Sequence, residues 1–173
     1  MSKTPEPRRS GPRPVDRVDD PILENNAILE AWRICYLANY VVFPLYRHME
    51  KEFNITRPEW VALFCLAHQE PICAQDIMVK TWLPKNSINR GVKLLAQKGL
   101  ITKRKDPQDG RRTLLSLTQE GWKIYSQTLP FAVTRKERLI SSLDDQELRL
   151  FNKLLMKLCV SVSRRSANLN NGE

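Results

Sequence analysis

The side chains best suited to recognition chemistry recur at helical spacing between residues 83 and 101 of this 173-residue chain. On a 3.6-residue wheel, Ile88, Val92 and Leu95 share one apolar face. The opposite face is polar and consists of Asn86, Asn89, Arg90, Lys93 and Gln97. Asn and Gln amides can form two hydrogen bonds with adenine, and Arg or Lys can bond guanine. This face therefore carries the residue types that read base edges in a DNA groove.

The ends of this stretch have the residues of a short helix. Pro84 suits the first helical position, where its missing N–H costs nothing, and Gly99 suits the left-handed residue just past the end. Residues 74–81, anchored by Ile77 and Met78, form a shorter helix directly before it. Two short helices in this order indicate a helix-turn-helix unit.

A basic hairpin is predicted immediately after the second helix. Residues 101–105 and 113–117 have the pattern of short strands, and the segment between them contains the turn formers Pro107 and Gly110. Between residues 85 and 112 there are nine Lys or Arg against two Asp, so most of the net charge of +9 lies here. This concentration favours a polyanionic partner such as nucleic acid.

The hairpin sequence resembles that of a known family. Asp109-Gly-Arg111, followed by Leu117-Thr-Gln-Glu-Gly121, is similar to the wing signature of the MarR family of winged helix-turn-helix regulators. The resemblance implies that the second helix enters the major groove and that Arg111, paired with Asp109, reaches the minor groove. The residues expected to contact DNA are Lys85, Asn86, Ser87, Asn89, Arg90, Lys93, Lys103, Lys105, Asp109, Arg111 and Arg112.

Trp82 departs from the family pattern, which usually has a small residue, often Gly, in the turn before the recognition helix. A bulky residue with a positive φ is costly. We therefore expect either a turn of another shape or a Trp82 that packs against the first helix of the motif.

The rest of the chain is predicted to be helical, which makes the fold mainly α with a small β-wing. Residues 21–53 form a long apolar helix that Pro44 should kink or break near Val42. Thr56 and Glu59 form a capping box that opens a helix over 58–68. Ile72 is a brief strand, and the helix from Thr118 to about Ser142 is expected to be interrupted or bent at Pro130.

The last helix should begin at a second capping box, Asp144 to Glu147. It carries a heptad-like apolar seam of Leu148, Phe151, Leu155, Leu158 and Val162. The seam predicts a homodimer, because two-fold operators suit two copies of such a motif, although packing within one chain is the alternative. The expected organisation is a disordered tail over 1–20, a dimerisation region over 21–55 and 119–164, a DNA-binding region over 56–118, and a disordered tail over 165–173.

The composition argues against several other classes of protein. No apolar run is long enough to span a membrane and the N-terminus lacks the apolar core of a signal peptide, so we expect a cytoplasmic protein. The two histidines, His48 and His68, come with no nucleophile elbow, metal spacing or phosphate loop, which disfavours an enzyme, a metal site or a bound cofactor. The four cysteines are expected to be small buried apolar residues: Cys35, Cys65, Cys73 and Cys159.

The leading hypothesis is a homodimeric transcriptional regulator, most often a repressor in this family, that binds a pseudo-palindromic operator. The resemblance implies release by a small aromatic acid or an acyl-CoA thioester. Candidate effector residues are Trp32, Tyr36, Tyr40, Arg47, Trp60 and Phe64, although aromatic residues at helical spacing usually just pack. Two alternatives stay open. One is a thiol-based redox regulator, which is disfavoured because the family's reactive position falls at Trp32, three residues before Cys35. The other is a winged helix used for protein contacts.

Overall fold

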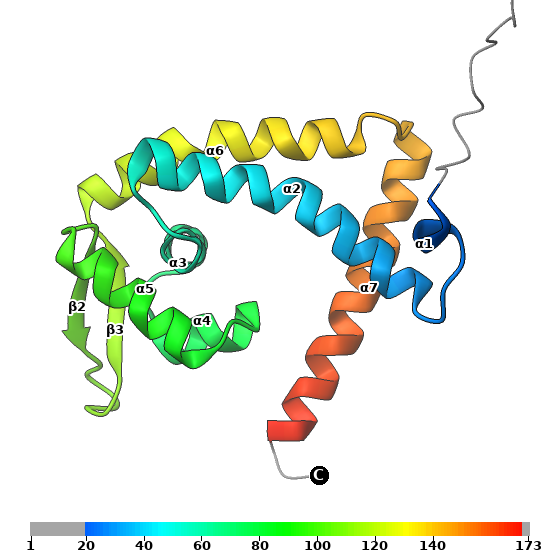
Figure 1. Ribbon diagram of the computed structural model, residues 1–173. Helices are drawn as coiled ribbons and strands as arrows, with labels where there is room; N and C mark the ends of the chain where they lie inside the picture. Colours follow the sequence, from blue (N-terminus) through cyan, green and yellow to red (C-terminus); the bar gives the residue numbers. More distant parts are fainter. Residues whose placement is uncertain (1–19, 171–173) are drawn as a thin grey trace, which may run out of the picture. The chain divides into compact units, whose positions relative to one another are not determined.

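The computed structural model describes residues 20–170, with side chains as far as Arg164. Figure 1 shows its elements, which are α1 (Pro21–Glu24), α2 (Leu29–Phe53), α3 (Arg57–His68), β1 (Ile72–Cys73), α4 (Ala74–Thr81), α5 (Lys85–Gln97), β2 (Ile101–Lys105), β3 (Thr113–Leu117), α6 (Gln119–Ile140) and α7 (Asp145–Asn170). The mainly helical fold with a small sheet confirms the predicted class. The chain divides into two compact units, and the boundary between Asn39 and Tyr40 falls inside α2.

The predicted helix over 21–53 is divided, because an asparagine side chain takes the place of helical backbone bonds. Asn26 Nδ2 donates to the carbonyl oxygen of Ile22 at 2.6 Å, and Asn26 Oδ1 accepts from the N–H of Ile28 at 2.8 Å. Such local bonds compete with the helix ladder. The single-helix prediction was therefore wrong at this point. Of the predicted N-terminal tail, residues 1–19 lie outside the described residues.

Neither internal proline ends its helix. Pro44 lies inside α2 and Pro130 inside α6, so the break that was one alternative at Pro44 and the interruption that was one alternative at Pro130 do not occur. The two helices pack together beside these prolines, where the rings of His48 and Phe131 stack at 4.0 Å. Packing of this kind outweighs the backbone hydrogen bond that a proline removes, because most helical stability comes from tertiary contacts.

The start of α7 confirms the predicted capping box, but its end lies further along than expected. Asp144 Oδ1 accepts from the N–H groups of Gln146 and Glu147, and Glu147 Oε2 accepts from the N–H of Asp144. The helix then continues to Asn170, past the predicted boundary at 164. The remaining residues, 171–173, lie outside the described part of the chain.

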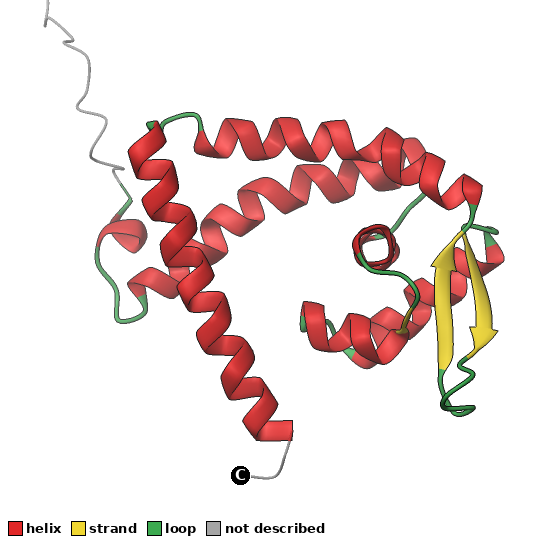
Figure 2. Ribbon diagram, turned by 180° about the vertical axis from the view of Figure 1, so that it is seen from behind, coloured by secondary structure: helices red, strands yellow, loops and turns green. Residues whose placement is uncertain are grey.

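The helix-turn-helix and the hairpin have the predicted bounds to within one residue. The three strands form an antiparallel sheet in the order β1-β3-β2, with Ile72 opposite Leu115 and Lys103 also opposite Leu115 on the other side. Figure 2 shows β2 and β3 side by side with the tip loop at one end. The apolar faces of α3, α4 and α5 bury Leu63, Ile77, Ile88 and Leu95 completely, together with Leu115 of the sheet at 2% exposure.

Trp82 contradicts both expectations for the turn between α4 and α5. The turn has the left-handed shape, with Trp82 at φ 57° and ψ 15°, and the residue is 65% exposed instead of being buried against α4. A non-glycine residue in this region is strained.

A buried carboxylate joins α3 to the end of α5. Glu59 is fully buried, and its Oε2 accepts from the Thr56 N–H at 2.9 Å and the Thr56 hydroxyl at 2.6 Å, which confirms the capping box. Its Oε1 lies 2.7 Å from Nζ of Lys98, whose side chain is 28% exposed and which also donates to the carbonyl oxygen of Asn54. A buried charge needs such partners, because desolvation without them is costly.

We predict that Lys98→Met lowers the free energy of unfolding by about 2 kcal/mol, because it leaves the Glu59 carboxylate buried without its cation. Lys93→Met is the matched control, since Lys93 is an exposed lysine on the same helix, and its effect should stay within about 0.5 kcal/mol. Urea unfolding at one protein concentration measures both changes. Adding Glu59→Gln to Lys98→Met should cost less than the sum of the single changes, and an additive result would contradict the coupling.

Candidate nucleic-acid interface

Helix α5 presents a polar face outward. Lys85, Asn86, Asn89, Arg90 and Lys93 are exposed, and Ser87 is half-buried. Pro84 is the N-cap instead of the first helical residue, and its carbonyl accepts from the N–H groups of Ser87 and Ile88 at 3.0 and 3.2 Å. The first turn contains no acidic residue, so the positive end of the helix dipole is left available to an anion.

The position of α5 depends on a close contact with α3. Gly91 lies against Pro58, and a Cβ at this glycine would come within 2.8 Å of the Pro58 carbonyl carbon. Ile88 and Leu95, on the same face as Gly91, have no exposed surface. Because this face is fully occupied, the amide and cationic side chains of α5 point away from the protein.

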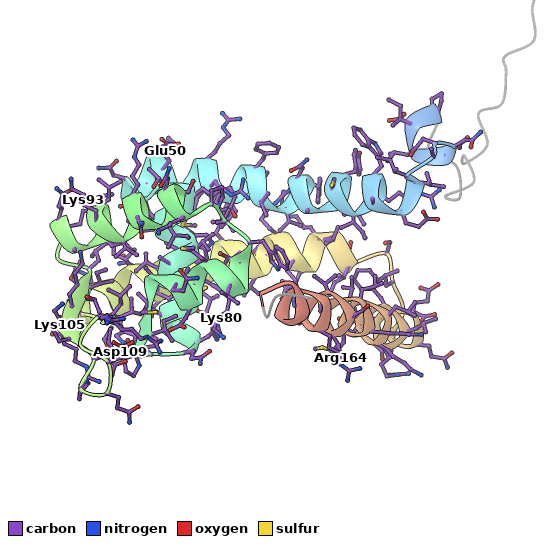
Figure 3. All side chains as sticks on the ribbon, turned by 90° about the horizontal axis from the view of Figure 1, so that it is seen from below. Glu50, Lys80, Lys93, Lys105, Asp109 and Arg164 are labelled. Carbon is purple, nitrogen blue, oxygen red and sulfur yellow. The ribbon has the colours of Figure 1, made fainter. Side chains whose placement is uncertain are left out.

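The hairpin tip is organised by two aspartates. Asp106 Oδ1 accepts from the Gln108 N–H at 2.9 Å, and Asp109 Oδ1 accepts from the Arg111 N–H at 3.0 Å. Lys105 Nζ donates to the Gly110 carbonyl at 3.3 Å. Figure 3 shows Lys105 and Asp109 of the hairpin and Lys93 of α5 at the same end of this unit. The hairpin therefore carries its cations beside the exposed face of α5.

The predicted ion pair between Arg111 and Asp109 is wrong. Asp109 binds the backbone N–H of Arg111, and among the described residues no ion pair involves the Arg111 side chain. Asp109 is instead occupied with the turn, because its carbonyl also accepts from the Arg112 N–H at 2.9 Å. The exposed guanidinium of Arg111 is thus left to a partner.

Arg112 lies against the protein itself, although it was predicted at the DNA surface beside Arg111. Its Nη2 is 2.9 Å from Asp76 Oδ2 and 3.4 Å from the sulfur of Cys73, and its Nε is 3.9 Å from Asp106. Burial alone would raise the pKa of Asp76, but hydrogen bonds from Cys73 and the Arg112 guanidinium hold the pKa below its ordinary value. Arg112 thereby joins the hairpin to the start of α4.

The strand register reveals one cation that the prediction omitted. Lys103 and Lys105 are opposite Leu115 and Thr113, whereas Arg104 is opposite Leu114 and lies on the other face of β2. All three side chains are exposed. The alternation of side chains along a strand would have identified cations on both faces of this hairpin instead of on one.

The candidate effector residues are brought together only in part. The buried Trp60 ring is 6.1 Å from Phe64 and stacks on Tyr125 at 6.1 Å. The Tyr125 hydroxyl is hydrogen-bonded to Nε2 of His68 at 3.0 Å, and burial raises the pKa of Tyr125. Histidine and tyrosine next to these aromatic rings are polar groups that the sequence interpretation did not include.

Two other candidate effector residues, Tyr40 and Arg47, have separate contacts of their own. The Tyr40 ring lies 4.5 Å under the guanidinium of Arg135, and Arg135 Nη2 donates to the Tyr40 carbonyl at 2.6 Å. Arg47 is exposed and shares a polar hollow with Glu50 and Glu52. The remaining two, Trp32 and Tyr36, are exposed and belong to the unit that ends at Asn39.

The cysteines differ from the prediction of buried apolar residues. Cys73 is buried and Cys65 half-buried, but Cys35 and Cys159 are exposed, because they lie on helices with uncovered faces. Burial raises the pKa of Cys65, which makes its thiol a poor nucleophile near neutral pH. Within residues 20–170, no group of three or more metal-ligating side chains could hold an ion, and no helix is long and apolar enough to cross a membrane.

The predicted seam on α7 is exposed over most of its length. Leu148 and Phe151 are half-buried, whereas Leu155, Leu158 and Val162 are exposed. Exposed apolar residues also occur beside the seam, at Leu150, Leu154 and Met156. A helix with this much apolar surface in water indicates an interaction face.

Known proteins share this arrangement. The MarR family model matches residues 55–113. The organic hydroperoxide resistance transcriptional regulator of Bacillus subtilis is 32% identical over 95 residues, which are 49% of this chain and 65% of that protein. The chain therefore matches just under two thirds of that relative's length.

Solved structures agree with the sequence match. A MarR/EmrR family regulator from Acinetobacter sp. ADP1 has a TM-score of 0.68 and 26% identity, over 78% of this chain and 95% of that one. The PcaV regulator of Streptomyces coelicolor, solved with its natural ligand, has a TM-score of 0.61 and 24% identity, over 81% and 96%, which is a likeness of fold. The Bacillus relative and both solved neighbours are named as regulators, and residues 55–113 of this chain form a MarR family domain.

Proposed function

We propose that the chain is a sequence-specific DNA-binding repressor that acts as a homodimer on a pseudo-palindromic operator. The observation that carries this proposal is the exposed amide and cationic face of α5 beside a basic hairpin. A winged helix used only for protein contacts has no need of this concentration of positive charge, which suits a phosphate backbone.

The two halves of the surface are assigned different tasks. Asn89 and Arg90 lie in the first turns of α5, where side chains reach base edges in the major groove. Arg111 is at the hairpin tip, and its guanidinium, which has no ionic partner within the described residues, suits phosphates and a narrow minor groove. Arg112 is assigned to the protein scaffold, because Asp76 already neutralises it.

We predict that Asn89→Ala weakens operator binding by about 1 to 3 kcal/mol and relaxes the preference at particular base pairs. Arg111→Ala should weaken binding to most sequences together. It should also flatten the slope of log K against log salt by about 0.9 for each phosphate that the variant no longer neutralises. The measurement is a salt series for each variant on two duplexes. One is a genomic DNA fragment that the wild-type protein binds, and the other has the same sequence scrambled.

Thr102→Ala serves as a control on the hairpin, because it alters an exposed, uncharged residue. The assignment of base reading to α5 and of phosphate contacts to the hairpin would be wrong if Arg111→Ala left the affinity and the salt slope unchanged while Asn89→Ala weakened binding to all sequences equally. Weak binding of the wild type to every duplex would favour the protein-contact alternative.

The homodimer is proposed from the exposed apolar side chains of α7 and from the exposed aromatic and aliphatic residues of α2. Phe43 is 62% exposed, and Leu158 on α7 is 53% exposed. A second copy would cover such faces, and two copies would present two reading helices to successive major grooves.

We predict that light scattering of the wild type at low micromolar concentration gives twice the chain mass. Replacing Leu155 and Leu158 with Glu should give the mass of one chain, since it would place charges in the interface. Exposed Lys153 on the same helix provides a control, and Lys153→Glu should leave the mass doubled. A monomeric wild type would refute the proposed dimer.

The proposed effector is a small anionic aromatic compound or its CoA thioester, which would hold two winged regions at a spacing that no longer fits DNA. The support is the aromatic group around Trp60, with Tyr125 and His68 as polar contacts, and a structural neighbour that was solved with a ligand. Redox release is the second candidate, favoured by the exposed Cys35 and by the hydroperoxide-resistance relative.

We predict that benzoate or benzoyl-CoA raises the melting temperature and weakens operator binding by about 1 to 3 kcal/mol, which is the usual size of such a coupling. Cumene hydroperoxide tests the second candidate in the same assay, where release of the wild type but not of Cys35→Ser would support it. If neither aromatic compound nor the peroxide altered operator affinity, both forms of regulation would be wrong.

A further inference from the structure

The turn between α4 and α5 holds a residue with a strained backbone, and no contact among the described residues offsets the cost of that strain. Trp82 has a φ of 57°, a region that favours glycine because it has no Cβ. Its side chain is 65% exposed, so burial does not offset the strain. Strained backbone at a surface position is a reason to look for a function at that position.

The turn itself needs only the backbone of this residue. The Trp82 N–H donates to the Met78 carbonyl at 2.9 Å, and the Thr81 hydroxyl donates to the Ile77 carbonyl at 2.7 Å. Across the described residues, the indole ring stacks on no other ring and its N–H meets no acceptor. Glycine would make the same turn without strain. These contacts therefore reveal no role for the indole in the fold.

The surroundings of Trp82 fit a polyanion. Lys80 and Lys85, both exposed, lie two residues before it and three after it, and Figure 3 shows Lys80 at the end of α4. The nearest carboxylate along α4, Asp76, is already paired with Arg112. In a helix-turn-helix the first helix crosses the DNA backbone and the start of the second enters the groove, so the turn between them lies at the groove edge.

We propose that Trp82 contacts the sugar-phosphate backbone of the operator at the edge of the major groove, an inference that rests on the proposed function. The indole N–H donates to a phosphate oxygen, since indole is a donor without an acceptor. The ring packs on the adjacent deoxyribose, which removes apolar surface from water. The strained turn thus stabilises the complex at the expense of the free protein.

The test compares Trp82→Gly with the wild type in thermal unfolding. It also compares their affinities, over a series of salt concentrations, for a genomic duplex that the wild type binds. The glycine variant should melt about 3 °C higher, because the strain is removed. It should bind DNA about tenfold more weakly, because it lacks the indole's packing and its hydrogen bond to a charged group. An indole displaces no counterion, so its removal should leave the salt slope unchanged, unlike the removal of the Arg111 side chain.

Two further variants isolate the side chain. Trp82→Phe keeps a ring but not the N–H, and its affinity should fall between those of the wild type and Trp82→Gly. Trp122→Phe changes another exposed tryptophan, on α6, and should bind as the wild type does.

The outcomes separate this inference from the proposed function. A wild type that binds no duplex in a salt-dependent manner defeats the proposed function. A wild type that binds, together with a Trp82→Gly variant that binds equally tightly, overturns the role of Trp82 alone. A glycine variant that melts lower, or that no longer has the doubled mass, overturns it as well, because the indole would then serve the fold or a protein contact.

Discussion

The carboxylate of Glu59 is fully buried and accepts hydrogen bonds from Thr56 at the start of α3 and from Lys98 at the end of α5. The same two helices meet again where Gly91 lies against Pro58. These contacts hold α5 by its apolar face and by its last turn. Its polar face is consequently presented in one orientation, which suits side chains that must meet base edges with little loss of conformational freedom.

A second ion pair joins the hairpin to the start of α4. Arg112 reaches from the hairpin to Asp76 and Cys73 at the start of α4, while its neighbour Arg111 has no ionic partner in the described chain. Adjacent arginines therefore differ in what they can do, because one charge is neutralised within the protein and the other is free to neutralise a phosphate. The turn at Trp82 and the apolar seam of α7 are two further exposed features, one with a strained backbone and the other with apolar side chains in water.

Local sequence signals were sufficient to predict the elements of the winged region. These signals were the capping boxes, the apolar period of α5, the turn formers of the hairpin and the family signature. The same reasoning was less successful in the long helices. There, a side chain can replace the backbone hydrogen bonds of a helix, and a neighbouring helix can stabilise one that contains a proline. Asn26 divided the first helix, while the packing of α2 on α6 kept both helices intact through their prolines.

Which of the hairpin cations are available to a partner could be identified only after the elements were packed together. Arg111 and Arg112 are identical in type and adjacent in sequence, and nothing local reveals that Asp76, far back along the chain, pairs with one of them. Strand register likewise separated Arg104 from Lys103 and Lys105. The left-handed φ of Trp82 was likewise not predicted from the local sequence, because a residue with a Cβ rarely adopts it. Composition and periodicity establish what each helix and strand is, but pairing and strain arise only from tertiary packing, because they depend on groups that are distant in the sequence.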